Sequence, residues 1–139
     1  MLKKYAYIQV LAVAIFICLS SMSFAAQNNE RLKGTWENPQ YIEGVWKLIF
    51  HADGSYDAFS KLEASKGAIK GECKIVEKWT DSNGCFCYKT IFWSDKGQKS
   101  YCLMKISASG KILEYVEDFM EYPKLFNSEV YTYRKLYKN

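Results

Sequence analysis

The sequence predicts an all-β protein, an eight-stranded antiparallel up-and-down β-barrel. Most of the chain consists of short segments that are rich in β-branched and aromatic residues and that alternate in polarity. Glycine-containing turns join most of these segments, as in a meander of hairpins. Trp36 lies on the first segment and Arg134 on the last, and these two side chains meet only if the sheet closes on itself.

Residues 1–25 have the layout of a secretory signal peptide rather than of a strand. A basic start with Lys3 and Lys4 precedes an apolar run over 10–19, and Ser23 and Ala25 supply small residues before a cleavage site after Ala25. The alternative is an uncleaved membrane anchor, but an apolar run of about 10 to 15 residues is shorter than the roughly 20 that span a bilayer. The predicted mature chain, residues 26–139, is long enough for one domain.

Eight strands follow in the mature chain. Alternation and β-branched or aromatic content place them at 34–38, 44–51, 55–62, 67–79, 85–93, 99–107, 111–119 and 129–137. The turns between them carry Asp53-Gly54, Lys66-Gly67, Asn83-Gly84, Lys96-Gly97 and Ser109-Gly110. Asn-Gly is the strongest of these turn signals, because both central residues of a type I′ turn need a positive φ. No segment shows a helical period, and the best place for a short helical turn is 120–127.

The connections differ in length between the two ends of the predicted sheet. One end carries the tight turns at 53–54, 81–84 and 109–110, and the other carries the mostly longer connections at 39–43, 63–66, 94–97 and 120–128. Closure into a barrel removes the free edges that an open meander would expose. Trp36 and Arg134 both belong to the tight end. We call the tight end the base and the other end the mouth, and we expect Gly34, Trp36 and Arg134 to form a structural latch at the base.

Charge argues against a nucleic-acid partner. Loss of Lys3 and Lys4 with the signal peptide lowers the formal net charge from +4 to about +2, and no basic block remains. The mature chain is rich in lysine, and Arg31 and Arg134 are its two arginines. Arginine is planar and multidentate, so Arg134 is expected to stack or to bind through several hydrogen bonds where lysine could not. The alternative is that arginine stands there by chance.

The opening Gly34-Thr35-Trp36 and the basic residue on the last strand resemble the calycin superfamily, the lipocalins and their small bacterial relatives. A Gly-x-Trp motif opens the first strand in that family, and a basic residue, commonly Arg, packs over the Trp from the last strand. The resemblance implies an up-and-down barrel and, in many members, binding of a small apolar molecule inside it. It assigns the packing role to Arg134.

Alternation also predicts which side chains point into the barrel. Strand two is expected to point Trp46, Leu48 and Phe50 inward, strand four Ile69, Cys73, Ile75, Glu77 and Trp79, and strand seven Leu113, Tyr115 and Phe119. An inward Glu77 would be a buried carboxylate that needs a partner and could anchor a ligand. The alternative for the interior is that its aromatic side chains simply fill it, since eight strands leave little extra room.

Side chains near the mouth are the candidates for ligand binding, because long loops carry function more often than tight turns do. They are Tyr41, Trp93, Phe119, Tyr122 and Phe126. A small apolar ligand would bury its surface against these aromatic rings.

Four cysteines remain in the mature chain, an even number that predicts disulfides in an exported protein. The turn positions place Cys73 and Cys102 at similar heights, both inward, on strands that flank the fifth, and leave Cys85 and Cys87 as a second pair. Strands two apart are about 9.5 Å from each other, beyond the roughly 7 Å limit for a disulfide, so the first pair needs a bulge. A redox pair or a metal site is the alternative for Cys85 and Cys87.

The sequence carries no hydrolytic motif, and we expect neither an enzyme nor a cofactor or metal. His51 is the one histidine of the chain, and no nucleophile elbow or glycine-rich phosphate loop occurs. The leading hypothesis is an exported, periplasmic or secreted barrel that binds a small apolar or amphipathic molecule at its mouth. The alternative is a protein-binding barrel, an inhibitor or envelope-assembly factor that docks through its mouth loops.

Overall fold

The computed structural model describes residues 30–124, 126 and 129–137, and the predicted signal peptide lies outside this range. Eight strands make up the described part: β1 (Gly34–Glu37), β2 (Val45–Phe50), β3 (Ser55–Ser60), β4 (Ile69–Thr80), β5 (Phe86–Ser94), β6 (Lys99–Ile106), β7 (Ile112–Asp118) and β8 (Tyr131–Leu136). A single 3₁₀ turn, η1 (Ala64–Lys66), precedes β4.

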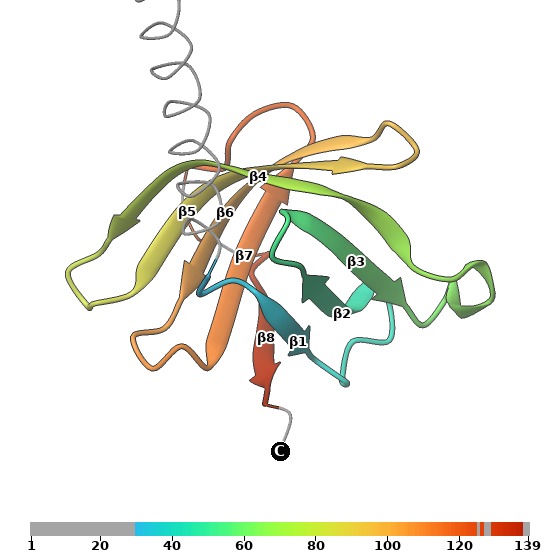
Figure 1. The fold of residues 1–139 in the computed structure, drawn as a ribbon, viewed down its shortest axis with the longest axis horizontal. Coiled ribbons are helices and arrows are strands. Elements are labelled where there is room, and N and C mark those ends of the chain that lie inside the picture. Colours follow the sequence, from blue (N-terminus) through green and yellow to red (C-terminus); the bar gives the residue numbers. More distant parts are fainter. Residues whose placement is uncertain (1–29, 125, 127–128, 138–139) are drawn as a thin grey trace, which may run out of the picture.

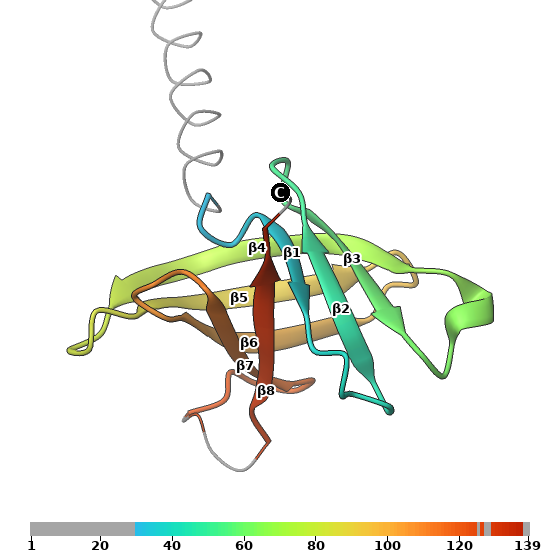
Figure 2. The ribbon, with the colours of Figure 1, turned by 90° about the horizontal axis from the view of Figure 1, so that it is seen from below.

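Each strand pairs antiparallel with the next along the chain, and β8 returns to pair with β1 (Figure 1). The closing contact sets Trp36 opposite Lys135 and Glu37 opposite Arg134. A second view also shows β1 and β8 side by side (Figure 2). The predicted fold class, an eight-stranded antiparallel up-and-down barrel, is therefore confirmed.

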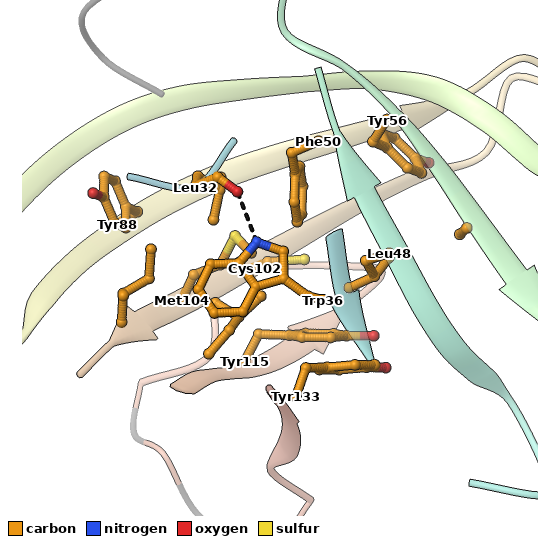
Figure 3. Close-up of a cluster of buried hydrophobic side chains, with 13 residues drawn as sticks. Leu32, Trp36, Leu48, Phe50, Tyr56, Tyr88, Cys102, Met104, Tyr115 and Tyr133 are labelled. Carbon is orange, nitrogen blue, oxygen red and sulfur yellow. Dashed lines mark hydrogen bonds between the residues drawn. The ribbon is translucent and has the colours of Figure 1, made fainter. Parts of the chain in front are cut away.

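The hydrophobic core lies inside the barrel and extends to its base. Leu32, from the segment just before β1, is buried there together with Trp36 (Figure 3). Strand β4 adds partly buried residues, and the remaining buried members of the cluster come from β2, β3 and β5 to β8: Leu48, Phe50, Tyr56, Ala58, Tyr88, Cys102, Met104, Ile106, Leu113, Tyr115 and Tyr133. Alternation along the strands brings these residues to one face, the inner face of the closed sheet.

Side chains extend the seam between the first and last strands toward the mouth. The backbone pairing of β1 with β8 ends at Glu37 and Arg134. Beyond it, the Asn38 side-chain amide donates to the Thr132 carbonyl over 2.8 Å, and the Tyr41 hydroxyl accepts from the Thr132 N–H over 2.8 Å. These two bonds occupy the backbone groups that a longer first strand would have paired, so the barrel stays closed where β1 is too short.

Two bulges change which side chains point inward. A register shift between Val45 and Lys47 brings Val45 against the core, while Trp46 lies within reach of the Lys47 and Lys61 ammonium groups. A second shift between Ile75 and Glu77 turns Glu77 outward, where it pairs with Lys89 at 3.1 Å. The predicted inward positions of Trp46 and Glu77 are therefore wrong, because one extra residue in a strand reverses the alternation after it.

The predicted helical turn at 120–127 is also wrong for the described residues of that segment. They form bends and irregular backbone, and residues 125 and 127 lie outside the described set. Pro123 gives the physical reason, since it lacks an N–H and disfavours the helical conformation of Tyr122 before it. Within the described ranges, no helix has the length and the apolar character needed to cross a membrane.

All four described cysteines are free thiols, so both predicted disulfides are wrong. Cys73 pairs across the ladder with Phe92 on β5, whereas Cys102 pairs with Thr90, and β5 itself separates the two cysteines. Cys85 and Cys87 are two residues apart. Side chains at this spacing leave an extended chain in the same direction, so the two Cβ–Sγ bonds do not converge as an S–S bond requires.

Candidate functional site at the mouth of the barrel

The inner space of the barrel is not completely filled. A cavity of about 160 Å³ opens at the mouth, and we call it the mouth cavity. It is lined by Val45, Leu48, Tyr56, Ala58, Ile69, Phe92, Ser94, Gln98, Ser100, Cys102, Tyr115, Glu117 and Phe119. These residues come from β2 to β7 and from the adjoining connections, so the cavity is built by most of the barrel wall.

The position of the cavity along the barrel follows from its lining residues. Val45 and Ile69 begin their strands at the mouth, Ser94 and Gln98 flank the β5–β6 turn, and Phe119 follows the end of β7. The buried layer toward the base, which includes Trp36, Met104 and Leu113, closes the other side. The predicted assignment of base and mouth thus agrees with the place where the barrel is hollow.

Aromatic rings form much of the wall. Tyr56 of β3 and Phe92 of β5 meet edge to face, with ring centroids 4.9 Å apart. Tyr115 of β7 stacks on Tyr131 at 5.0 Å and on Tyr133 at 5.7 Å. Because β3 and β7 are four strands apart in a closed ring of eight, the Tyr56 and Tyr115 rings face the cavity from opposite walls.

One carboxylate lines the mouth cavity. Glu117 has the same parity on β7 as the inward Leu113 and Tyr115, and its ladder partner is the inward Cys102. Its side chain remains accessible through the open mouth, yet protein atoms surround it on the other sides. This burial raises the pKa of Glu117, and the Ser100 hydroxyl acts in the opposite direction by favouring the ionised form.

The other titratable groups of the lining are neutral near pH 7. Burial raises the pKa of Tyr56 to about 12, and it raises the pKa values of Cys102 and Tyr115 as well. The described lining residues include neither lysine nor arginine. Glu117 therefore provides the charge of the mouth cavity.

Of the five residues predicted to bind a ligand, Phe119 lines the mouth cavity, with 57% of its surface exposed. The other four do not belong to the lining. Tyr41 packs edge to face on Tyr131 and Tyr133 in the seam, and Trp93 lies beneath the Lys99 ammonium group.

Tyr122 and Phe126 fold back from the mouth onto the outside of the barrel. The Tyr122 ring packs edge to face on Tyr101 at 5.0 Å, and the Lys105 ammonium lies 4.8 Å from the Phe126 ring. Both contacts lie on the outer face of β6, because Tyr101 and Lys105 alternate with the inward Cys102 and Met104. A long loop at the mouth thus does not by itself place its aromatic residues in the cavity.

At the base, Trp36 is fully buried, and its indole N–H donates to the Leu32 carbonyl over 2.7 Å (Figure 3). The cation over the ring is Lys135, whose ammonium lies 5.0 Å from the ring and donates to the Arg31 carbonyl over 3.1 Å. Gly34 has a φ of 122°, and a Cβ there would lie 3.2 Å from the Lys135 side chain. Gly34 and Trp36 therefore occupy the predicted latch.

Arg134 does not join this latch, and its expected contact with Trp36 is wrong. Arg134 is exposed, and its partner in the β1–β8 ladder is Glu37, the residue after Trp36. Its side chain therefore projects from the outer face of β8. The arginine that stacks at the base is Arg31, whose guanidinium lies 3.4 Å from the centre of the Phe86 ring. Outside this stack a solvent-open hollow of about 700 Å³ runs along the β4–β5 hairpin.

Sequence reasoning missed Glu117, although its signal was present. Leu113 and Tyr115 were predicted to point inward, and continuing the same alternation leads to Glu117. The nearby Glu114 and Asp118 are acidic as well, a composition that is also typical of a solvated strand. In the structure Glu114 does lie on the outer face, where it pairs with Lys105 at 3.2 Å.

Among the residues that the structure describes, no group of three or more His, Cys, Asp or Glu side chains could hold a metal ion. Comparison with known protein families, characterised proteins and solved structures finds no match to this chain. The geometry of the mouth cavity is therefore the basis for assigning a function.

Proposed function

We propose that this protein is an exported, lipocalin-like barrel that binds one small apolar or amphipathic molecule in its mouth cavity, without catalysis. The mouth cavity carries this proposal: a hollow with an aromatic and aliphatic wall and a few polar groups at one end is typical of small-molecule sites. Gly34 and Trp36 at the base, with a cation from the last strand over the Trp ring, support the resemblance to the calycin superfamily.

The cavity volume limits the size of the ligand. An apolar cavity of about 150 Å³ in another protein holds benzene, and the mouth cavity, at about 160 Å³, offers similar space. A single ring or a short aliphatic chain would be enclosed, whereas the rest of a longer molecule would extend through the mouth. Burial of such a ring would contribute about 25 cal/mol for each Å² of apolar surface removed from water.

Filling the cavity tests this proposal. Ala58 is a buried lining residue, so the ring introduced by Ala58→Phe would occupy the space of the ligand. We expect benzyl alcohol, a neutral probe of suitable size, to bind the wild-type protein and to lose at least tenfold in affinity for this variant. Ala108→Phe is the matched control, because Ala108 is an exposed residue in a turn at the base.

Calorimetry and amide chemical shifts are suitable readouts, since none of the four tryptophans lines the cavity. Binding should shift the resonances of Ser100, Tyr115 and Phe119 more than those of Leu32 and Trp36. Absence of binding to the folded wild-type protein, or shifts confined to the base, would contradict the proposal. Export is tested separately by mass spectrometry of the cell envelope fraction, where a mature chain that begins at Ala26 is expected.

A second candidate function is protein binding through the mouth loops. Three connections at the mouth each expose at least one large apolar side chain: Ile42 at 71%, Leu62 at 69% and Met120 at 86%. Exposed apolar residues at loop tips are a feature of interaction surfaces. If this function applies, replacing all three residues with serine should abolish capture of one envelope protein while benzyl alcohol affinity stays unchanged.

A further inference from the structure

The mouth cavity combines two features that recognise the same chemistry. The first is its charge: Glu117 lines it, and the described lining includes neither lysine nor arginine. Five other carboxylates of the described chain, those of Glu37, Asp57, Glu63, Glu77 and Glu114, form an ion pair with a lysine or histidine. No ion pair to Glu117 occurs among the described residues. A carboxylate that lines a cavity and has no cationic partner is poised to receive one from a ligand.

The second feature is the aromatic wall. Tyr56 and Phe92 lie on one side of the cavity, and Tyr115 and Phe119 lie on the other. The face of an aromatic ring attracts a cation, by about 0.5 to 2 kcal/mol depending on how far the cation is removed from water. The same rings also bury an apolar stem. Aromatic walls with a carboxylate at the open end therefore suit a molecule that has an apolar body and a positively charged end.

A hollow beside the mouth cavity carries the same sign of charge. This hollow of about 370 Å³ adjoins the mouth cavity and shares Glu117 with it. The charged residues that line this hollow are Glu117, Asp118, Glu121, Lys124 and Glu129, four carboxylates against one lysine. A concave surface dominated by one sign of charge raises the local concentration of the opposite ion.

We propose that the ligand of the mouth cavity is a small organic cation, a primary or quaternary amine on a short apolar stem, with Glu117 as its counter-ion. This inference rests on the proposed function and adds the chemical class of the ligand. The stem lies between the aromatic walls, and the ammonium group lies toward the mouth, against the carboxylate. Metal ions do not fit the same site, because one carboxylate among apolar residues offers too few ligands.

Three probes of one shape test the inference. Benzylamine is a cation near pH 7, benzyl alcohol is its neutral counterpart and benzoate is an anion with the same ring. We expect benzylamine to bind the wild-type protein at least tenfold more tightly than benzyl alcohol, which is about 1.4 kcal/mol, and benzoate to bind most weakly. Calorimetry at low ionic strength gives the three affinities, and salt should reduce that of benzylamine most.

Two variants assign the preference to one carboxylate. Glu117→Gln removes the charge but keeps the shape, so the preference for benzylamine over benzyl alcohol should fall to less than about threefold. Glu114→Gln is the matched control, since it removes a carboxylate from the outer face of the same strand and should keep the preference. Urea unfolding of both variants checks that the barrel remains folded.

The pH dependence gives an independent readout. Benzylamine affinity should fall as the pH is lowered through the raised pKa of Glu117, whereas benzyl alcohol affinity should stay constant. The groups that face Glu117 from the lining are Tyr56, Cys102 and Tyr115, and those in the adjoining hollow are Asp118, Glu121, Lys124 and Glu129. Burial keeps the tyrosines and the cysteine of the lining neutral as the pH is lowered from 7. The decrease in benzylamine affinity at low pH should therefore be weaker in Glu117→Gln, which lacks the titrating carboxylate of the lining, than in Asp118→Asn, which keeps it.

The outcomes separate this inference from the function on which it rests. If benzyl alcohol binds the wild-type protein as tightly as benzylamine, the cavity binds small molecules but the charge assignment is overturned. An equal loss of preference in Glu114→Gln and Glu117→Gln would overturn the role of Glu117. If neither the amine nor the alcohol binds, the proposed function and the inference both fail.

Discussion

The base and the mouth of this barrel are built from the same eight strands but differ in packing: the base is filled and the mouth is hollow. At the base, Leu32 covers the end of the barrel and Trp36 is fully buried. At the mouth, the wall leaves a cavity of about 160 Å³, with Phe119 more than half exposed at its edge. The packed side chains at the base therefore contribute to the stability of the fold, whereas the cavity at the mouth lacks some of these contacts.

The electrostatics of the two ends differ in the same sense. The Lys135 ammonium at the base has an aromatic face and a carbonyl oxygen as partners. Glu117 at the mouth has no ion pair among the described residues, and burial raises its pKa. Satisfied groups at the base are expected of a structural element, whereas an unsatisfied charge at the mouth is expected of a binding site. Four predictions test this contrast.

The largest effect should follow removal of the buried indole at the base. Trp36→Ala deletes a fully buried ring together with its hydrogen bond to the Leu32 carbonyl, so the free energy of unfolding should fall by about 3 to 5 kcal/mol. Phe119→Ala, at the mouth, should cost less than about 1 kcal/mol, because its ring is already exposed. Urea unfolding followed by circular dichroism measures both values. Equal costs would contradict the contrast.

The backbone around the mouth should also be intolerant of substitution, even though the cavity is open. A Cβ at Gly71 would lie 1.9 Å from the Trp93 carbonyl oxygen, so Gly71→Ala forces β4 and β5 apart. We expect a loss of about 1 to 3 kcal/mol in unfolding free energy. Lys70→Ala at the neighbouring exposed position should stay within about 0.5 kcal/mol of wild type. A neutral Gly71→Ala variant would show that the wall itself is loose.

Replacing the basic residues of β8 should separate its two faces. Lys135→Met removes the cation over Trp36 and the bond to the Arg31 carbonyl, at a cost of about 1 kcal/mol. Burial lowers the pKa of Lys135, which means that part of the gain from these contacts offsets desolvation. Arg134→Met should change stability by less than about 0.5 kcal/mol. Thermal unfolding measures the stability of both variants. A larger loss in Arg134→Met than in Lys135→Met would indicate that Arg134 belongs to the latch.

The smallest effect should be a gain in stability. Glu117→Gln removes a carboxylate whose ionised form the fold disfavours, and because water still reaches it we expect a gain below about 1 kcal/mol near pH 7. Because the pKa of Glu117 is raised in the folded state, the free energy of unfolding of the wild-type protein should decrease as the pH rises from the unfolded-state pKa of 4.5 through the folded-state pKa. The neutral side chain of the Glu117→Gln variant does not take part in this decrease. The gain should vanish below pH 4.5. A loss of stability near pH 7 would show that Glu117 is a structural residue.

The sequence predicted the topology and most of the strand bounds because both depend on local signals. Asp53-Gly54 and Asn83-Gly84 mark their turns, and the glycines have φ values of 89° and 77°. No described residue other than glycine has a positive φ, so Asn83-Gly84 does not form the type I′ turn that the dipeptide suggests. Unequal turn lengths then distinguished the base from the mouth, and Phe119 was placed correctly at the cavity. Alternation also leads to Glu117, because it follows the inward Leu113 and Tyr115 on the same strand.

The errors arose where the tertiary structure changes the alternation or the spacing. The bulges after Val45 and Ile75 turned Trp46 and Glu77 outward. A difference of one residue in the closing register placed Lys135, rather than Arg134, over Trp36. Cys73 and Cys102 approach no closer than the intervening strand allows, which ruled out the bridge between them.

By itself, the sequence determined that eight strands alternate, where they turn and which end is tightly connected, because these properties depend on neighbouring residues in the chain. Only the tertiary structure decided the bulges, the register of closure and the cavity with its single carboxylate. These depend on how the two ends of a closed sheet meet and on how much space the inward side chains leave. Residues far apart in the sequence set both.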